Sequence, residues 1–433
     1  MRHVLFSLAF GCCALALSGE GPTVTVAAGE LDRKDCIVNF ALPEVVAAGN
    51  YALRDEAGGL LPLQVDGAHQ GCFVLDQLKA GQSKTYSVVK QEPAANAGVS
   101  VTKNGTALDV TIDGKKVISY FVEKSELPKG YGPEFQRGGY IYPVLTPSGK
   151  LVTDDYPPAH KHHHSVWGAW TKTEFEGRHP DFWNMGAKTA TVEPLGLWSA
   201  ENAQKFFPDE VGRASLPAGG HGGPPYWSGP VQGGFEAFHK YVDLGNPKAA
   251  DAHPTDALFE DWRVNVYRLG AADAKYRIFD IAIVQRCASK SPLVLPTYHY
   301  GGLGIRGHRT WDGKDNCEYL TSEGKTRATG NTKPEGKPER ARWCNMSGKV
   351  DGELAGITLL DHPSNFRAPQ PLRLHPTEPF IGTAPEQLGQ FEITPEKGYV
   401  AKYRLVVADG APNAADLDRL WKDYATPPVV TVK

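Results

Sequence analysis

The sequence lacks the features of membrane proteins and of nucleic-acid-binding proteins. After the N-terminal segment, no stretch approaches the roughly 18 continuous apolar residues of a membrane-spanning helix. An excess of one charge sign is also missing, because 22% of the residues are charged but the formal net charge is only −3. Nucleic-acid-binding domains usually concentrate positive charge. We therefore predict no membrane span and no nucleic-acid partner.

Motifs of common enzyme classes are absent as well. No serine lies in a GxSxG nucleophile elbow, and no cysteine has a catalytic partner nearby in the sequence. The glycine-rich residues 300–306 (YGGLGIR) are not followed by the lysine and Ser/Thr of a phosphate-binding loop. These absences argue against a serine or cysteine hydrolase and against a nucleotide-binding loop.

Cysteine is scarce, and the N-terminus determines how the few cysteines are interpreted. Arg2 and His3 precede an apolar run over residues 4–10 and then small residues, which predicts a signal peptide over residues 1–18. We expect a periplasmic or secreted protein, with a lipoprotein anchor at Cys12 as the alternative. Both disulfides and buried free thiols are compatible with the five remaining cysteines, the nearest pairs being Cys36 with Cys72 and Cys317 with Cys344.

The apolar periodicity is that of a β protein. Residues 108–112 alternate up to Asp113-Gly114 and the chain resumes at residues 117–120, which predicts a hairpin with a type I′ turn. Similar strand patterns recur at residues 264–269, 276–284, 293–295, 356–360 and 403–407. One helix is predicted near the C-terminus, with Asn413 as its N-cap and Leu417, Leu420, Trp421 and Tyr424 on one face.

We predict an all-β fold with two domains. Residues 22–92 form a small N-terminal β-sandwich, and residues 95–425 form a large two-sheet β-supersandwich that carries the site and ends in the helix. Residues 217–234 (PAGGHGGPPYWSGPVQGG) are predicted to be a long loop without regular structure.

The strongest candidate for a site is the histidine cluster at positions 160, 162, 163 and 164. In an extended segment His160, His162 and His164 share one face, and His163 lies on the other. His160 and His164 would then be about 13 Å apart at roughly 3.3 Å per residue, so one ion could not take all three unless the chain curls. A divalent metal held by His160 and His162 would need a distant ligand, for which the available residues are Asp181, Glu260 and His299.

Without a metal, the histidines would act as hydrogen-bonding and proton-transferring groups around a sugar or uronate. Arg306 would hold a carboxylate of the substrate. The predicted catalytic set is His162, His163, Asp181, Glu260, His299 and Arg306. The predicted substrate-binding set is His160, His164, Trp167, Trp183 and Tyr300, in which the aromatic rings offer stacking faces.

Several short motifs together resemble one known family. They are residues 140–143 (YIYP), 146–149 (TPSG), 160–167 (HKHHHSVW), 181–183 (DFW), 260–263 (EDWR), 300–306 (YGGLGIR) and 360–365 (LDHPSN). The chain resembles the PmoA-like family of secreted bacterial proteins, whose function is not established and whose label comes from a methane oxygenase subunit. By analogy of architecture, its fold looks like the sandwiches of sugar mutarotases and some polysaccharide lyases.

These observations lead to one expected function and two alternatives. We expect an exported carbohydrate-active protein that acts on or binds a sugar or uronate, with epimerase, lyase or glycosidase chemistry. The first alternative is a metal-dependent oxygenase or hydrolase that uses the same histidines. The second is a glycan-binding module without catalytic activity. No cofactor beyond a divalent metal is suggested by the sequence.

Overall fold

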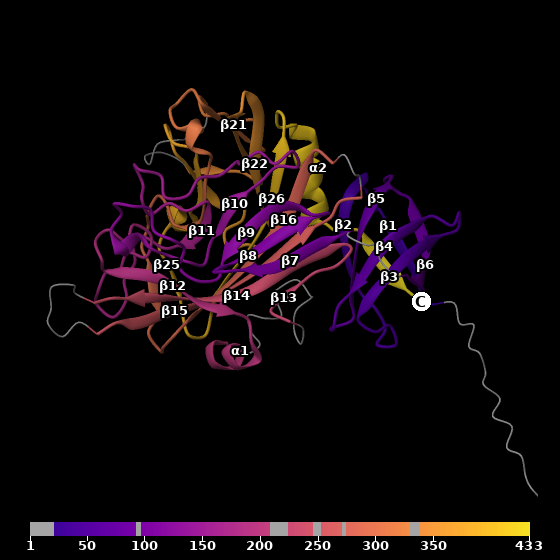
Figure 1. Ribbon diagram of the computed structural model, residues 1–433, viewed down its shortest axis with the longest axis horizontal. Helices are drawn as coiled ribbons and strands as arrows, with labels where there is room; N and C mark the ends of the chain where they lie inside the picture. Colours follow the sequence, from indigo (N-terminus) through magenta and orange to yellow (C-terminus); the bar gives the residue numbers. More distant parts are fainter. Residues whose placement is uncertain (1–20, 92–96, 208–223, 246–252, 271–273, 330–337) are drawn as a thin grey trace, which may run out of the picture.

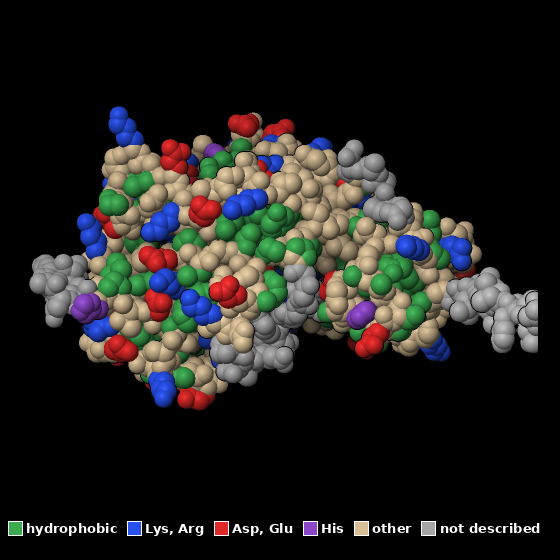
Figure 2. Space-filling view, turned by 60° about the horizontal axis from the view of Figure 1, so that its bottom comes forward, with side chains coloured by type: hydrophobic (Ala, Val, Ile, Leu, Met, Phe, Trp, Pro, Cys, Tyr) green, Lys and Arg blue, Asp and Glu red, His purple; other side chains and the backbone are tan. Residues whose placement is uncertain are grey.

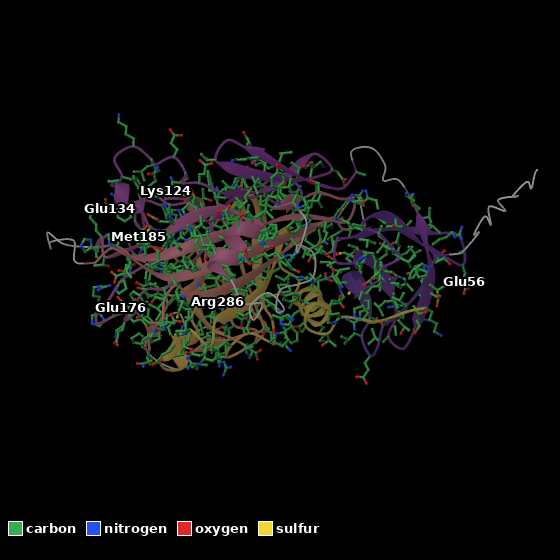
Figure 3. All side chains as sticks on the ribbon, turned by 90° about the horizontal axis from the view of Figure 1, so that it is seen from below. Glu56, Lys124, Glu134, Glu176, Met185 and Arg286 are labelled. Atoms are coloured by element: carbon green, nitrogen blue, oxygen red, sulfur yellow. The ribbon has the colours of Figure 1, made fainter. Side chains whose placement is uncertain are left out.

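The computed structural model describes residues 21–91, 97–207, 224–245, 253–270, 274–329 and 338–433. The predicted signal peptide lies outside these residues. Nearly all regular structure is antiparallel β-sheet, arranged as a small sheet at one end of the molecule and two large sheets at the other (Figure 1). Glu56 marks the end with the small sheet, whereas Glu134 and Glu176 lie at the opposite end (Figure 3).

The small sheet has seven strands and its own hydrophobic core. Its strand order is β2 (Arg33–Ala41), β5 (Gln70–Leu78), β4 (Leu60–Val65), β3 (Gly49–Asp55), β6 (Ser83–Lys90), β1 (Thr23–Ala27) and β27 (Val429–Val432). The core cluster includes Val24, Val38, Leu63 and Phe73, all fully buried. The last strand of the chain, β27, pairs with β1, so the C-terminus returns to the N-terminal sheet beyond the predicted domain limit at residue 425.

Two larger sheets form the main body. The order in one is β20 (Glu339–Arg340), β23 (Pro371–Leu374), β24 (Phe380–Thr383), β18 (Gly302–Arg306), β11 (Val166–Ala169), β10 (Ile141–Val144), β9 (Lys115–Phe121), β8 (Ala107–Ile112) and β7 (Val99–Asn104). The order in the other is β12 (Ala190–Leu197), β14 (Gln232–Asp243), β15 (Thr255–Tyr267), β16 (Tyr276–Cys287), β26 (Tyr399–Asp409), β22 (Glu353–Asp361), β21 (Trp343–Val350) and β19 (Cys317–Thr321). A short strand, β13 (Tyr226–Trp227), adds to β14.

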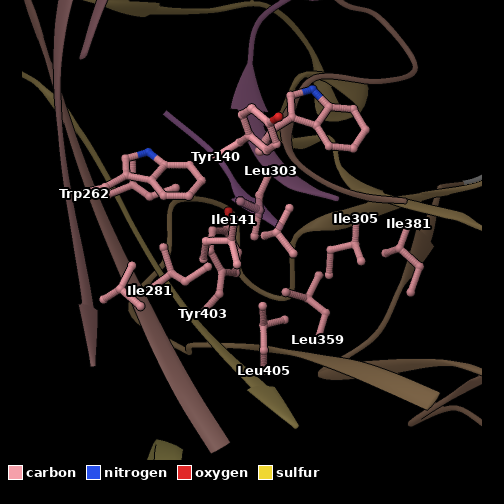
Figure 4. Close-up of a cluster of buried hydrophobic side chains, with 14 of the residues drawn as sticks. Tyr140, Ile141, Trp262, Ile281, Leu303, Ile305, Leu359, Ile381, Tyr403 and Leu405 are labelled. Atoms are coloured by element: carbon pink, nitrogen blue, oxygen red, sulfur yellow. The ribbon is translucent and has the colours of Figure 1, made fainter. Parts of the chain in front are cut away.

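Side chains of both large sheets meet in one extensive core (Figure 4). Ile141, Leu303 and Ile305 come from the first of these sheets, and Trp262 and Leu405 from the second. Burial of this much apolar surface is the dominant stabilising contribution to such a sandwich. A two-stranded sheet, β17 (Leu293–Leu295) with β25 (Phe391–Ile393), lies beside it. The predicted all-β, two-sheet architecture is confirmed.

The predicted hairpin is confirmed, and one predicted loop is partly wrong. Asp113 and Gly114 both have positive φ, at 49° and 76°, as a type I′ turn between β8 and β9 requires. In the segment predicted as a loop, residues 217–234, residues 217–223 lie outside the described part, but β13 and the start of β14 are regular strand. Gly234 is one of the residues of β14. A Cβ at this position would lie 2.0 Å from the carbonyl oxygen of Val264, so only glycine fits there.

Few helices accompany the strands. The α-helices of the described residues are α1 (Ala200–Phe206), which the sequence reasoning missed, and the predicted helix α2 (Ala414–Ala425). Short 3₁₀ turns occur at η1 (Pro133–Phe135), η3 (Arg309–Trp311) and η4 (Pro385–Leu388). No helix in the described ranges is long and apolar enough to cross a membrane.

The N-cap of α2 gives a first testable prediction. Asn413 Oδ1 accepts hydrogen bonds from the backbone N–H groups of Ala415 and Asp416, at 3.0 and 3.2 Å. We expect Asn413→Ala to lower the free energy of unfolding by about 1 kcal/mol, and Asn413→Ser to retain most of it. Urea unfolding of the two variants measures this, and equal loss in both would contradict a capping role.

The cysteines of the described residues are free thiols. The disulfides considered in the sequence analysis therefore do not form, and the strand registers place Cys36 opposite Leu75 and Cys344 opposite Thr321. Burial raises the pKa of the Cys317 and Cys36 thiols to about 12, which keeps both protonated and unreactive. Acidic and basic side chains are interspersed on the face shown in Figure 2.

Candidate functional site

The histidine segment forms two tight turns and not the extended chain that the sequence predicted. The backbone N–H of His160 donates to the carbonyl oxygen of Pro157 at 3.0 Å, and that of His163 donates to the carbonyl oxygen of His160 at 2.8 Å. Extended structure begins only at Val166, the first residue of β11. The turns bring His160 and His163 together, with their rings stacked at a centroid distance of 4.7 Å. The rings of His160 and His162 also lie close together, at 5.6 Å, but the prediction that His163 points away from them is wrong.

Glu378 completes this pair and was not predicted. It lies just before β24, a strand that pairs with β18, the neighbour of β11, so sheet register brings it to the histidines. One ligand atom from each of His160, His163 and Glu378 lies within 4.8 Å of the other two. Nδ1 of His160 is 2.9 Å from Oε2 of Glu378. The only local signal of this site in the sequence was the segment 375–379 (HPTEP), in which a histidine lies three residues before Glu378.

Arg306 holds Glu378 in place. Its side chain is fully buried, its Nη1 donates to Glu378 Oε2 at 2.8 Å, and its Nη2 donates to Asp312 Oδ1 at 2.5 Å. Both terminal nitrogens of the guanidinium are thus bound to carboxylates of the protein. The predicted role of Arg306 as a clamp for a substrate carboxylate is wrong, because the fork that would grip the substrate is already filled.

Burial keeps the neighbouring imidazoles neutral. It lowers the pKa of His162 to about 3 and that of His375 to about 4, and it holds the pKa of His163 well below its usual value. Burial alone would raise the pKa of Glu378, but the hydrogen bond with His160 and the charge of Arg306 outweigh it and bring the pKa to about 2. At neutral pH the pocket therefore combines neutral imidazoles with an ionised carboxylate.

The aromatic residues near the histidines are core. Trp167 and Trp183 are at most 1% exposed, and their rings pack against each other at 4.9 Å. His163 stacks between His160 and Phe380, with ring centroids 5.1 Å from Phe380 and Trp167. Neither tryptophan has a free face, so the prediction that they stack on a sugar ring is wrong. Their role is to form the apolar wall that fixes the ring of His163.

Two further predicted residues stabilise turns. Nδ1 of His164 lies 2.8 Å from Oδ1 of Asp155, and the same carboxylate accepts a hydrogen bond from Tyr140 at 2.8 Å. His164 is fully buried and anchors the segment. Asp181 Oδ1 accepts from the backbone N–H groups of Trp183 and Asn184, and the Asn184 side chain also contacts the Tyr300 hydroxyl at 3.1 Å. Asp181 thus holds its own turn in place.

Glu260 and His299 are not brought to the histidine cluster by any contact that the structure shows. Glu260 lies between the two large sheets, where it binds His239, Tyr241 and Gln285. The ring of His299 packs against those of Tyr298 and Tyr300. The predicted site therefore divides into three groups, and we keep the name histidine pocket for His160, His163 and Glu378 with the adjoining His162, His375 and Arg306.

The chain belongs to a family that has no assigned function. A family model described as a family of unknown function (DUF6807) matches residues 107–422, which is most of the chain and includes the whole histidine pocket. No curated protein matches the chain. The predicted resemblance to PmoA-like proteins stays a prediction.

Proposed function

We propose that this member of the DUF6807 family binds a divalent transition-metal ion in the histidine pocket and uses it to act on a carbohydrate or uronate. The observation that carries the proposal is the convergence of ligand atoms of His160, His163 and Glu378 within 4.8 Å. It combines the carbohydrate function expected from the sequence with the metal of the first alternative, and the ligands differ from those considered there, because His163 replaces His162 and Glu378 replaces the distant ligands.

The spacing of the ligand atoms supports a metal. Two ligands on one ion, each bound at about 2.1 Å, lie about 3 Å apart when they meet at a right angle. His160 Nδ1 and Glu378 Oε2, which share a hydrogen bond in the absence of an ion, are 2.9 Å apart and so already have this spacing. Nδ1 of His163 is buried and makes no hydrogen bond among the described residues, so its lone pair is available to a metal ion. Two histidines and one carboxylate are the ligand set of metal centres that keep open positions.

The surroundings support a catalytic centre more than a closed structural one. The His160 side chain is 33% exposed, so one side of the pocket faces solvent. Arg306 orients the carboxylate in the way that outer hydrogen bonds orient metal ligands. A bound ion would act as a Lewis acid and lower the pKa of a water molecule or substrate hydroxyl.

The pKa values favour this chemistry over histidine catalysis without a metal. A general acid must hold its proton at the working pH, whereas burial keeps His162, His163 and His375 deprotonated. Neutral imidazole is the form that binds metals. The carbohydrate part of the proposal rests on the analogy with sugar-processing β-sandwiches, and export rests on the N-terminal sequence alone.

Elemental analysis of the full-length protein, purified without added metal, tests the proposal. We expect about one equivalent of a transition metal per chain, and loss of at least nine-tenths of it in His163→Ala and in Glu378→Ala. His162→Ala is the matched control, because this histidine lies in the same turn but outside the ligand set, and it should retain the metal. The proposal is wrong if no added divalent ion binds, or if His162→Ala loses the metal while His163→Ala retains it.

A further inference from the structure

The turn that carries Glu378 is anchored by a side chain of the other large sheet. Glu378 lies between β23 and β24 of the first large sheet, whereas Tyr319 lies in β19, at the edge of the second. Tyr319 is fully buried, and its hydroxyl donates to the carbonyl oxygen of Glu378 at 2.8 Å. The carbonyl oxygens of His375 and Phe380, at the two ends of the turn, are each 3.1 Å from this hydroxyl. One phenol therefore contacts both ends of the turn and its centre.

Arg327 is a second anchor of the same turn. The residue is only 7% exposed, and its guanidinium carbon lies 4.7 Å from the centre of the Tyr319 ring. Its Nη2 donates to the carbonyl oxygen of Glu378 at 2.9 Å and to the Tyr319 hydroxyl at 3.1 Å. The backbone N–H of Phe380 donates to this carbonyl oxygen as well, at 2.9 Å. Three donors thus converge on the carbonyl oxygen of Glu378, which fixes the main chain at the residue that supplies the carboxylate.

Arg327 also holds the segment that supports Arg306. Its Nη1 donates to the carbonyl oxygen of Gly313 at 2.9 Å. The preceding residue, Asp312, binds Arg306, and Arg306 in turn binds the carboxylate of Glu378. The guanidinium of Arg327 therefore joins the two segments that meet at the histidine pocket. It contacts the main chain of Glu378 directly, and it acts on the Glu378 carboxylate through Asp312 and Arg306.

Fold stability alone does not explain a buried arginine at this position. In the described part of the chain, Arg327 forms no ion pair with an acidic side chain, and its terminal nitrogens bind two backbone carbonyls and a hydroxyl. Burial of a guanidinium costs free energy, and a well-packed apolar side chain of similar volume is often at least as stabilising. What an apolar side chain lacks is a rigid fork of donors with fixed directions. That fork is suited to hold Glu378 in one position.

We infer that Tyr319 and Arg327 are positioning residues of the histidine pocket, which hold the main chain of Glu378 so that its carboxylate stays beside His160. Neither residue is a metal ligand. Their importance for metal binding rests on the proposed function, because a bound ion tolerates displacements of only about 0.2 Å in its ligands. Loss of the groups that orient metal ligands typically lowers metal affinity about 10- to 100-fold.

A cobalt titration of the full-length, metal-free protein tests the inference in the metal-bound state. Tyr319→Phe removes the hydroxyl but keeps the ring beside Arg327. We expect it to raise the Kd for Co²⁺ about tenfold or more and to alter the visible absorption spectrum of the bound ion, because Glu378 is displaced. Arg327→Lys keeps the charge but loses the fork, so it should have the same effects, and it provides the test if Tyr319→Phe does not fold.

Tyr399→Phe is the matched control. The Tyr399 hydroxyl is also buried, and it accepts a hydrogen bond from the Gln370 amide at 3.0 Å. Among the described residues it has no contact with the histidine pocket. Its removal should therefore lower the free energy of unfolding, as measured with urea, but leave the Kd and the spectrum of bound Co²⁺ unchanged. A general loss of stability would affect Co²⁺ binding equally in Tyr399→Phe and Tyr319→Phe, whereas a positioning role affects only the latter.

Amide hydrogen exchange of the metal-free protein separates this inference from the proposed function. We expect residues 375–380 to exchange about tenfold faster or more in Tyr319→Phe, and at the wild-type rate in Tyr399→Phe. If the wild type binds no Co²⁺, the proposed metal is wrong, and faster exchange would still show that Tyr319 holds the turn of Glu378. The inference is overturned if exchange of this turn is unchanged in Tyr319→Phe. It is also overturned if the wild type binds Co²⁺ and Tyr319→Phe binds it with the same Kd and spectrum.

Discussion

Replacing Glu260 with alanine is expected to lower the free energy of unfolding by about 3–5 kcal/mol, because it breaks a fully buried polar network. Oε1 of Glu260 lies 2.9 Å from Nδ1 of His239, and both side chains are at most 1% exposed. Oε2 accepts from the Tyr241 hydroxyl at 3.1 Å and from the Gln285 amide at 2.5 Å. The hydroxyl of Tyr120 contacts the other nitrogen of His239. Without the carboxylate, several buried donors lose their acceptor at once.

Urea unfolding measures this effect, provided that the slope of the transition is the same in both proteins. Glu260→Gln keeps one acceptor oxygen and the volume of the side chain, so its loss should be smaller than that of Glu260→Ala. Glu193→Gln is the control, because Glu193 lies on the opposite face of the sheet at a half-buried position, and it should alter stability by less than about 0.5 kcal/mol. If Glu260 were catalytic and not structural, Glu260→Gln would abolish activity and leave the unfolding midpoint unchanged.

The sequence predicted strands well but not the partners that they bring together. The strand pattern at residues 264–269 identified the last part of β15, which begins at Thr255. It could not show that Glu260 belongs to the core face together with Trp262, because a buried carboxylate is stable there only through His239, Tyr241 and Gln285 on two neighbouring strands. The predicted catalytic role followed from residue type alone.

In the histidine pocket, too, the sequence pattern did not reveal which side chains lie together, even for residues that are close in the sequence. A period of two applies to extended chain, and the segment after Pro157 and Pro158 instead closes two turns before β11 begins. The prolines were visible in the sequence, but the hydrogen bonds that set the ring directions were not. Glu378 was beyond reach because its proximity depends on the pairing of β18 with β24, which only the folded sheet determines. The sequence predicted that Arg306 binds a carboxylate of the substrate. In the structure it binds the carboxylates of Glu378 and Asp312.

The buried carboxyl group of Glu386 is expected to lower the free energy of unfolding as the pH rises from about 5 to 8. Its carboxyl group is buried in the turn η4 close to Gly301, and Oε2 has no hydrogen-bond partner among the described residues. Burial raises its pKa from 4.5 to about 8. The folded protein therefore keeps the proton between these values, whereas the unfolded chain releases it.

The sign of the effect follows from proton binding. Between pH 4.5 and about 8 the folded state binds more protons than the unfolded state, so the free energy of unfolding decreases with rising pH. The contribution is complete below pH 4.5 and is lost by about pH 8, and at 1.36 kcal/mol per pKa unit it amounts to as much as about 5 kcal/mol. Glu386→Gln removes the titrating proton but preserves the shape of the side chain.

We therefore expect the stability of Glu386→Gln relative to the wild type to rise by several kcal/mol between pH 5 and pH 8, as measured by urea unfolding at each pH. Taking the difference between the two proteins cancels other groups that titrate in this range, such as Asp361, whose pKa is raised to about 6 by burial. Glu392→Gln, a change at an exposed position in β25, should give a profile parallel to that of the wild type. A parallel profile for Glu386→Gln as well would show that Glu386 is ionised in the folded protein and that its pocket admits water.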